Sequence, residues 1–544
     1  MIKQGKIPNH NANNASIEYH ADDGSLFSFG KSDKYTLDCM LLPSTIVANR
    51  CKEFLTYNSH SNPPIELLEQ YQLISIIPLN FEDIQVVYFP TSLSVNAKAY
   101  WQHTGEILSS RKAEAALRSF GFTIPNVTEL YSTKRECLSD SYSIDALRGL
   151  SPTQIIIQRI MTILNEPLSD NSITITTSGM TAINLALRLI CGVLGEEYKG
   201  GYELEMVVFG FPYLDTLKMM QRIELNPGGY HFFGNGTESD IDALEQLLIA
   251  RNSSNSSSRK RIGGVFTEFP TNPLLKAPNL RRLHSLSRQY GFLLVVDDTI
   301  GNFANLDLLQ HADVKVDILC TSLTKIFSGR GDVMAGSLVI NSLGPYYHKL
   351  REILPSLQPE PLYVEDALVL EINSRDFVER SKRIMKSTAT LALWLCEREE
   401  VQYVYYPHPD VIRIQRERSE VGARIAADID PLNIYTSLLR DDGDGDGEYG
   451  HGYGCLLSII LREDHDEKKF FDSLDFNKGP SLGTNCTLIC PYTLLAHYTE
   501  LDWAAGYGVD RRLVRVSVGL EDIDAILSRF DFALRSSSRA VSSL

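Results

Sequence analysis

The feature that most constrains the fold is a regular alternation of short apolar runs with helix-length segments between residues 170 and 340. Such an alternation predicts parallel strands joined by helices that cover both faces of one sheet. Strands are expected at 172–177, 205–209, 229–233, 262–267, 292–296, 316–320 and 335–340. Helices are expected at 180–194, 213–222, 239–251, 277–290 and 303–310. The sequence therefore predicts an α/β domain with a mostly parallel seven-stranded sheet.

Further segments flank this α/β region. Residues 1–135 are expected to form a mixed α/β N-terminal extension, because their apolar stretches are bounded by proline and asparagine. We predict the large domain at 136–384 and a smaller C-terminal α/β domain at 385–544. A chain of 544 residues has room for three or four domains, at a prior of about 150 residues each.

Charge and composition exclude several classes of partner. A net charge of −16 argues against nucleic acid or an anionic membrane, since both would repel such a surface. The N-terminus lacks an apolar signal segment and no run of 18 apolar residues occurs, so we expect a cytoplasmic protein. No metal site is expected, because the nine cysteines contain no CxxC pair and the acidic stretch 442–446 lacks the glutamate that a calcium loop requires.

Reactive side chains follow two successive apolar strands. Asp297 ends one of them, and Lys325 comes just after the next, preceded by Ser322 and Thr324. The carboxyl ends of parallel strands meet at the edge where open α/β sheets bind ligands. An amine, a carboxylate and hydroxyl donors are the groups that pyridoxal 5′-phosphate (PLP) needs for its imine, its pyridine nitrogen and its phosphate. Taken alone, Asp297 is equally well explained as a helix cap and Lys325 as a surface lysine.

Two further motifs favour the PLP interpretation. Gly179 and Met180 close a β-branched strand and open a helix, where free amides bind phosphate. Asn272 lies between two prolines at a strand end, which fixes it where it can donate to the cofactor's phenolate. An ordinary turn explains either motif by itself. The motifs of P-loop proteins, α/β-hydrolases and zinc proteases are absent.

The order of these motifs resembles the Cys/Met-metabolism PLP family, which includes cystathionine γ-synthases, γ-lyases, β-lyases and O-acetylhomoserine sulfhydrylases. The motifs are Ser178-Gly179-Met180, Pro270-Thr271-Asn272-Pro273, Val296-Asp297-x-Thr299, Ser322-x-Thr324-Lys325 and a run that starts at Arg515. The stretches 101–106, 209–216 and 481–485 are similar to the fungal cystathionine γ-synthase branch. The resemblance implies the aminotransferase-like fold, fold type I.

The resemblance also implies a role for each site residue. Lys325 would be the catalytic imine lysine, Asp297 the partner of the pyridine nitrogen and Asn272 the neighbour of the ring oxygen. The residues expected to hold the phosphate are Gly179, Met180, Ser322 and Thr324. Arg515, assisted by Ser481, would bind the substrate carboxylate, which suits a guanidinium fork. A surface ion pair is the alternative for Arg515.

Two departures from the family pattern leave alternatives open. The family's stacked tyrosine falls in a stretch that reads Phe209-Gly210-Phe211-Pro212-Tyr213 here, so either Phe209 or Tyr213 stacks on the cofactor. If Phe209 does, the phenol for proton transfer is lost. The family's Tyr-Ser-Arg motif, which reaches the phosphate of the neighbouring subunit, is missing; Arg148 is the expected substitute and Arg111 its rival. A homodimer or homotetramer with shared active sites is implied.

The expected reaction is γ-replacement on an O-acyl-L-homoserine, with the acetyl and succinyl esters both open. Lys325 would remove the Cα proton and then a Cβ proton, provided that burial and the cofactor lower its pKa. A cysteine thiol as nucleophile would give cystathionine, a carbon nucleophile would extend the amino-acid chain, and elimination alone would make a γ-lyase. A catalytically silent PLP-fold binding protein is the alternative from another class. We therefore expect small molecules, an amino acid and a nucleophile, as partners.

Overall fold

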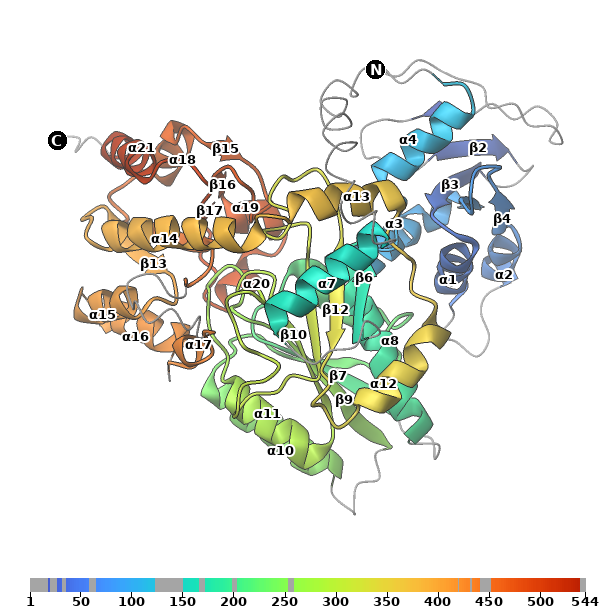
Figure 1. Cartoon of the computed structure of the whole chain (residues 1–544), viewed down its shortest axis with the longest axis horizontal. Helices are drawn as coiled ribbons and strands as arrows, with labels where there is room; N and C mark the ends of the chain where they lie inside the picture. Colours follow the sequence, from blue (N-terminus) through green and yellow to red (C-terminus); the bar gives the residue numbers. More distant parts are fainter. Residues whose placement is uncertain are drawn as a thin grey trace.

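Three β-sheets organise the chain, each surrounded by helices (Figure 1). The structure is a computed structural model that describes residues 18–19, 27–31, 36–57, 65–122, 150–165, 172–197, 203–252, 259–418, 420–430, 433–440 and 452–538. Arg148 and the acidic stretch 442–446 lie outside these described residues. Within them, no helix combines the length and the apolar character that crossing a bilayer requires.

The central sheet has seven strands in the order β6-β12-β11-β10-β9-β7-β8. Its strands are β6 (Ile173–Thr176), β7 (Glu203–Phe209), β8 (Tyr230–Phe233), β9 (Lys260–Glu268), β10 (Leu293–Asp297), β11 (Ile318–Thr321) and β12 (Gly336–Ile340). β12 runs antiparallel to both of its neighbours, and the other pairings are parallel. The predicted mostly parallel seven-stranded sheet is confirmed.

Helices cover both faces of this sheet, because successive strand side chains point to opposite faces and both sets are apolar. Val208 and Val295 pack on one face, where the helices are α8 (Gly179–Glu197), α9 (Leu214–Gln221) and α12 (Tyr347–Ile353). Val207 and Val296 pack on the other face, where the helices are α7 (Pro152–Leu164), α10 (Glu238–Asn252) and α11 (Leu280–Tyr290). Helix α13 (Val364–Asn373) lies along α7.

The helix expected at 303–310 is wrong. These residues form turns, with one isolated bridge from Leu306 to Leu439. The buried Asn305 amide donates to the Tyr435 hydroxyl at 3.2 Å and to the Gly452 carbonyl at 2.8 Å. Asparagine side chains that bind backbone and distant groups compete with helix formation. Tertiary hydrogen bonds therefore override the apolar spacing that suggested a helix.

The N-terminal sheet is antiparallel, in the order β1-β2-β3-β5-β4. Its strands are β1 (Glu18–Tyr19), β2 (Phe27–Lys31), β3 (Thr36–Leu42), β4 (Ser75–Pro78) and β5 (Gln85–Pro90). The helices around it are α1 (Thr45–Thr56), α2 (Ile65–Gln72), α3 (Ser94–Thr104) and α4 (Ser110–Ser119). The described residues between 18 and 122 are called the N-terminal segment below. Its helix α3 packs against α8 and α9 of the central sheet.

The C-terminal sheet has the order β13-β14-β17-β16-β15. Its strands are β13 (Val401–Tyr405), β14 (Leu456–Leu461), β15 (Asn477–Lys478), β16 (Leu488–Cys490) and β17 (Val514–Ser517). The helices here are α14 (Phe377–Cys396), α15 (Pro409–Arg418), α16 (Glu420–Ile429), α17 (Ile434–Ser437), α18 (Glu467–Ser473), α19 (Tyr492–Ala496), α20 (Leu501–Ala505) and α21 (Ile523–Ser536). Each sheet falls within one predicted domain, but α14 runs across the boundary at 384, so the boundaries themselves stay a prediction.

Candidate active site

Asp297 and Lys325 come from the ends of neighbouring parallel strands. Asp297 is the last residue of β10, and its register partner on β11 is Cys320. Lys325 follows β11 after a short turn in which its amide donates to the Ser322 carbonyl at 3.3 Å. The two side chains are close enough for the charge of each to act on the pKa of the other. An amine and a carboxylate therefore meet at one edge of the sheet.

The Lys325 amine is prepared for chemistry by its surroundings. It donates a hydrogen bond to the Ser481 hydroxyl at 3.1 Å. Burial lowers the pKa of Lys325 to about 8; the positive charge of Arg515 adds to the shift, and the Asp297 carboxylate opposes it. A lysine with such a pKa carries a free amine in a substantial fraction of molecules near neutral pH. That is the form that a nucleophile or a general base needs.

The Asp297 carboxylate has a second carboxyl group beside it. Glu268, the last residue of β9, is the register partner of Asp297. Burial raises the pKa of Asp297, whereas hydrogen bonds from Thr299 and the charge of Lys325 lower it. Burial and the Asp297 charge together raise the pKa of Glu268. Two buried carboxyl groups this close favour one shared negative charge over two.

Glu268 also holds the backbone on two sides of the site. One of its carboxylate oxygens accepts a hydrogen bond from the Tyr213 amide, and the other accepts one from the Asn272 amide at 3.3 Å. Glu268 is a site residue that the sequence analysis missed. The signal was its place at the end of a strand adjacent to the one that ends in Asp297.

A small hollow, partly open to solvent, lies between these strand ends and helices α8 and α9. Its lining residues are Ile183, Val208, Pro212, Thr216, Phe266, Thr267, Glu268, Val295, Asp297 and Cys320. Most of the wall is apolar, and the two carboxyl groups supply the charge. An apolar wall with a carboxyl pair is the chemistry that suits an aromatic ring with one protonated nitrogen.

Gly179 and Ser322 meet at the N-terminus of α8. A Cβ atom at position 179 would lie 2.8 Å from the Ser322 Cβ, so only glycine permits this close approach. The Ser322 amide donates to the Thr299 hydroxyl at 2.7 Å, which fixes the turn before Lys325. Helix N-termini favour phosphate through free amides and the helix dipole. The turn from Ser178 to Met180, called the phosphate turn below, is therefore the predicted site of the phosphate, against Ser322.

Met180 and Thr324 are also close to this turn, but their side chains have partners of their own. The Thr324 hydroxyl accepts a hydrogen bond from the Ala335 amide at 3.0 Å and donates to the Ala335 carbonyl at 3.2 Å. The Met180 sulfur accepts from the Thr216 hydroxyl at 3.9 Å. Thr324 thus ties the lysine turn to the segment that leads into β12, and its contact with phosphate stays a prediction.

The structure separates the two aromatic candidates for stacking. Phe209 is completely buried among Val207 and Phe233, on the face of the sheet opposite to the hollow. This orientation favours Tyr213 over Phe209 for stacking on the cofactor, because the Phe209 side chain points away from the hollow; the choice between them stays a prediction. Tyr213 is 46% exposed, precedes α9, and has a pKa that burial and Asp215 raise, with smaller contributions from Tyr492 and Glu268.

Arg515 is held in a fixed orientation above the site. Its guanidinium donates to the Asn272 side-chain oxygen and to the Ser481 carbonyl, at 3.1 Å each, and also to the Pro480 carbonyl. It lies over the Tyr492 ring, 4.8 Å from the centroid. Arg515 is only 3% exposed, so the alternative of a surface ion pair is wrong. The structure thus brings Arg515, Asn272 and Ser481 together.

Tyr492 is a site residue that sequence reasoning missed. Its ring supports the Arg515 guanidinium, and its hydroxyl accepts a hydrogen bond from the Asn272 amide at 3.3 Å. Burial raises the pKa of Tyr492 above its ordinary value. Nothing in the local sequence distinguishes this tyrosine, because its role comes from contacts with residues far away in the chain.

Two arginines were considered for binding the phosphate of the neighbouring subunit, and the structure describes only one of them. Arg111 donates to the Asp366 carboxylate at 2.8 Å and to the Asp332 carbonyl at 2.6 Å, so its guanidinium is used within its own chain. Arg148 lies outside the described residues. The arrangement favours Arg148 for a role across subunits, which stays a prediction.

The residues present fit PLP. Gly179 places the N-terminus of α8 against Ser322, where a phosphate would bind, Asp297 supplies a carboxylate for the ring nitrogen, and Lys325 supplies an amine of lowered pKa. These are the three contacts that the cofactor requires.

Comparison with known proteins gives the same assignment. Residues 141–430 match the model of the Cys/Met metabolism PLP-dependent enzyme family, which is more than half of the chain. Residues 25–109 match the N-terminal domain of fungal trans-sulfuration enzymes. A cystathionine gamma-synthase-like enzyme of Amanita muscaria is 34% identical over 93% of this chain and 89% of its own. The cystathionine gamma-synthase of Neurospora crassa is 32% identical over 92% of this chain and 86% of its own.

Among solved structures, the cystathionine gamma synthase of Xanthomonas oryzae pv. oryzae, in complex with aminoacrylate and cysteine, has the same fold. It superposes with a TM-score of 0.53 and 20% identity, over 72% of this chain and 87% of that one. The expected fold type I architecture is thereby confirmed. The chain is a PLP-dependent enzyme that belongs to the Cys/Met metabolism family, in its fungal cystathionine γ-synthase-like branch.

Proposed function

We propose that the protein catalyses γ-replacement on an O-acyl-L-homoserine, with the thiol of cysteine as the nucleophile and cystathionine as the product. The observation that carries this proposal is the hydrogen bond of the Lys325 amine to the Ser481 hydroxyl, next to the backbone carbonyl that Arg515 binds. An amino acid whose carboxylate is bound by Arg515 would present its Cα beside the Lys325 amine. Family membership supports the same reaction.

Each residue then has a task. Arg515 binds and orients the carboxylate, because its guanidinium is already fixed by Asn272 and Ser481. Lys325 takes the proton from Cα and then one from Cβ. The Cγ–O bond breaks and the acyl group leaves as a carboxylate, the cysteine sulfur bonds to Cγ as its thiol proton is lost, and protons return to Cβ and Cα. Asp297 holds the proton of the ring nitrogen. PLP, when bound, supplies the electron sink that makes the Cα and Cβ protons acidic.

The direct test is a product analysis with the holoenzyme. The protein is incubated separately with O-acetyl- and O-succinylhomoserine, each with cysteine, sulfide or a β-keto acid, and products are identified by mass. Cystathionine is expected with cysteine, and Lys325→Ala should give none. Formation of α-ketobutyrate alone would show elimination, and a product with a new carbon–carbon bond would show a carbon nucleophile. Either outcome would overturn the proposed reaction.

We also propose that the enzyme is a homodimer or homotetramer in which Arg148 serves the site of the neighbouring subunit. Support comes from Arg111, which is bound to Asp366 within its own chain. Mixing inactive Lys325→Ala with inactive Arg148→Ala tests this, because a mixed pair of subunits contains one site with both lesions and one intact site. Recovered activity is expected. Two inactive variants that stay inactive after proven subunit exchange would exclude the shared site.

A further inference from the structure

The N-terminal segment touches the phosphate turn directly. Helix α3 ends at Gly105, whose carbonyl accepts hydrogen bonds from the Ser178 hydroxyl at 3.2 Å and the Thr177 hydroxyl at 3.4 Å. These two residues immediately precede Gly179, where α8 begins. A residue outside the central sheet therefore sets the position of the side chains that start the turn.

Only glycine fits at position 105, because this residue lies so close to Ser178 and Thr181. Gly105 has a φ of +68°, the left-handed region, and a Cβ there would lie 2.1 Å from the Ser178 Oγ and 2.7 Å from the Thr181 amide nitrogen. Side chains other than glycine are strained at such a φ, and here the added atom would also displace the turn. Two independent constraints, the positive φ and the close approach to the phosphate turn, therefore require glycine at position 105.

The residue that follows anchors this contact in the interior. Glu106 has a side chain only 2% exposed, and it is bound by the Arg50 guanidinium and by the Tyr100 hydroxyl, each at 2.5 Å. Arg188 of α8 lies 4.0 Å from the same carboxylate. A buried carboxylate with these partners is strongly held in place, since losing a partner leaves an uncompensated charge. Glu106 therefore fixes Gly105 within the N-terminal segment and places a carboxylate beside Arg188 of α8.

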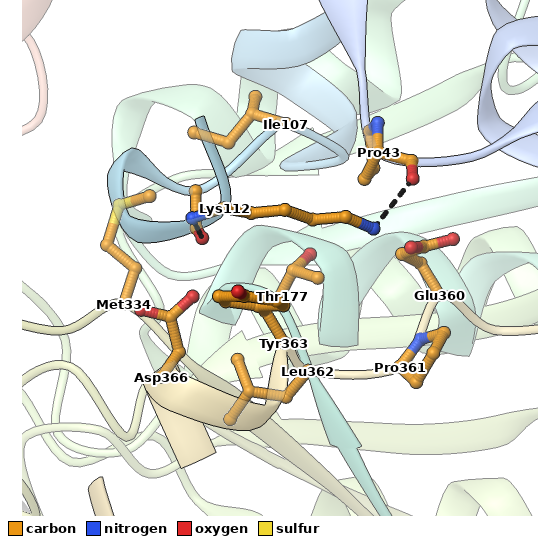
Figure 2. A pocket seen from close by; sticks show the side chains of 11 residues that line it. Pro43, Ile107, Lys112, Thr177, Met334, Glu360, Pro361, Leu362, Tyr363 and Asp366 are labelled. Atoms are coloured by element: carbon orange, nitrogen blue, oxygen red, sulfur yellow. Dashed lines mark hydrogen bonds between the residues drawn. The ribbon is translucent and has the colours of Figure 1, made fainter. Parts of the chain in front are cut away.

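A second contact reaches the other side of the cofactor site. Arg111 of α4 donates to the carbonyl of Asp332, in the loop that follows Lys325. Between the two contacts lies a pocket along the seam, lined by Pro43, Ile107 and Lys112 of the N-terminal segment and by Thr177 and Asp366 opposite them (Figure 2). The Lys112 amine closes one side of it through a hydrogen bond to the Pro43 carbonyl at 2.9 Å. The N-terminal segment thus contacts both the phosphate turn and the loop that follows Lys325.

We propose that the N-terminal segment is a working part of the cofactor site and that Gly105 is a positioning residue for the phosphate of PLP. The proposal rests on the proposed role of the phosphate turn but on no particular substrate. Gly105 acts through Thr177 and Ser178, whose positions set the direction of the first amides of α8. Displacing them weakens phosphate binding without touching the ring site at Asp297.

The test compares PLP with pyridoxal, which lacks the phosphate, as ligands of the full-length apoprotein. Dissociation constants are measured from the visible absorbance of the bound cofactor, with Gly105→Ala and the matched control Gly121→Ala. Gly121 also has a positive φ, +79°, but nothing lies within 4 Å of its added Cβ. Gly105→Ala should weaken PLP binding about ten-fold and leave pyridoxal binding within about two-fold. Gly121→Ala should change neither.

Two more variants distinguish a failure of the positioning role of Gly105 from a failure of the phosphate assignment itself. Glu106→Gln keeps the shape of the side chain but cancels the charge that Arg50 binds, so it should also weaken PLP relative to pyridoxal, and it decides the case if Gly105→Ala does not fold. Gly179→Ala tests the phosphate turn itself. If Gly179→Ala discriminates PLP from pyridoxal while folded Gly105→Ala and Glu106→Gln do not, the turn binds phosphate and the positioning role is wrong. If Gly179→Ala does not discriminate either, the assignment of the turn fails first.

Discussion

Glu268 and Asp297 lie side by side in register at the ends of strands β9 and β10, and both carboxyl groups line the same hollow. Burial and the neighbouring Asp297 charge raise the pKa of Glu268, so the folded apoprotein keeps a proton there that the unfolded chain releases above pH 4.5 or so. This difference makes the folded state less stable as the pH rises. The loss of folding stability begins near the ordinary glutamate pKa and increases as the pH rises further.

Glu268→Gln should remove that pH dependence. The glutamine side chain has one oxygen acceptor where glutamate has two, so one backbone amide loses its hydrogen bond. This loss should lower the free energy of unfolding by about 1–3 kcal/mol, equally at all pH values. Between pH 5 and pH 8, however, the free energy of unfolding of the variant should improve relative to that of wild type by at least about 1.4 kcal/mol, the equivalent of one pKa unit. Urea unfolding of the two apoproteins at both pH values measures this. A difference that stays constant with pH for Glu268→Gln would contradict the shared proton.

The lowered pKa of Lys325 predicts how fast the apoprotein captures PLP at each pH. Only the free amine reacts, so the rate should rise with pH and level off above about 8. Replacing Arg515 by glutamine removes the second-largest cause of the shift and should move the inflection to higher pH, while burial keeps it below the ordinary lysine value. Stopped-flow absorbance records the rates. An inflection that stays in place or falls in Arg515→Gln would show that the arginine charge does not reach the amine.

Arg515→Lys keeps the positive charge but loses the fork that Asn272 and Ser481 hold. The KM for O-acylhomoserine should rise about 10- to 100-fold with a smaller effect on kcat, because a point charge binds a carboxylate without the paired geometry. Tyr492→Phe is the matched control, since it keeps the ring beneath the guanidinium and removes only the hydroxyl that Asn272 binds. It should raise KM by less. Equal KM values in wild type and Arg515→Lys would remove Arg515 from the carboxylate site.

Tyr213 is the aromatic residue expected to stack on the cofactor. Tyr213→Ala should weaken PLP binding by about two- to ten-fold, equivalent to the ~0.5–1.5 kcal/mol of an aromatic pair, whereas Tyr213→Phe keeps the ring and should bind PLP nearly as wild type. Phe209→Leu should lower thermal stability and leave the PLP dissociation constant unchanged, because Phe209 is buried on the other face of the sheet. Absorbance titration and thermal unfolding separate the two effects. A Phe209→Leu protein that folds but loses PLP would reverse the assignment.

The part of the site that lies on strand ends was predictable from the sequence. Buried parallel strands are continuous apolar runs, so the residues that follow them, Asp297 and Lys325, could be assigned to one edge of the sheet before any coordinates. The Gly179 turn followed from the same rule, as a strand that leads directly into a helix. Local patterns were sufficient here, because neighbouring parallel strands of one sheet bring the residues that follow them close together in space.

Contacts made between distant segments were not predictable in this way. Tyr492 under Arg515 and Gly105 against Ser178 depend on how three sheets pack together, and no local pattern encodes that. The false helix at 303–310 has the same origin, since Asn305 binds partners more than a hundred residues away. The face on which Phe209 lies stayed undecided, because a change of one position along a strand exchanges the two faces of the sheet.

The position of β6 at the edge of the central sheet has a consequence for synthesis of the chain on the ribosome. Its sheet neighbour is β12, which begins 160 residues after β6 ends. During translation β6 emerges long before that neighbour exists, so the strand that leads into Gly179 waits unpaired while most of the sheet is being made. The cofactor site is thus a late product of biogenesis, and a nascent chain that stops between residues 326 and 335 would have Asp297 and Lys325 but no β12 to pair with the strand that leads into the phosphate turn.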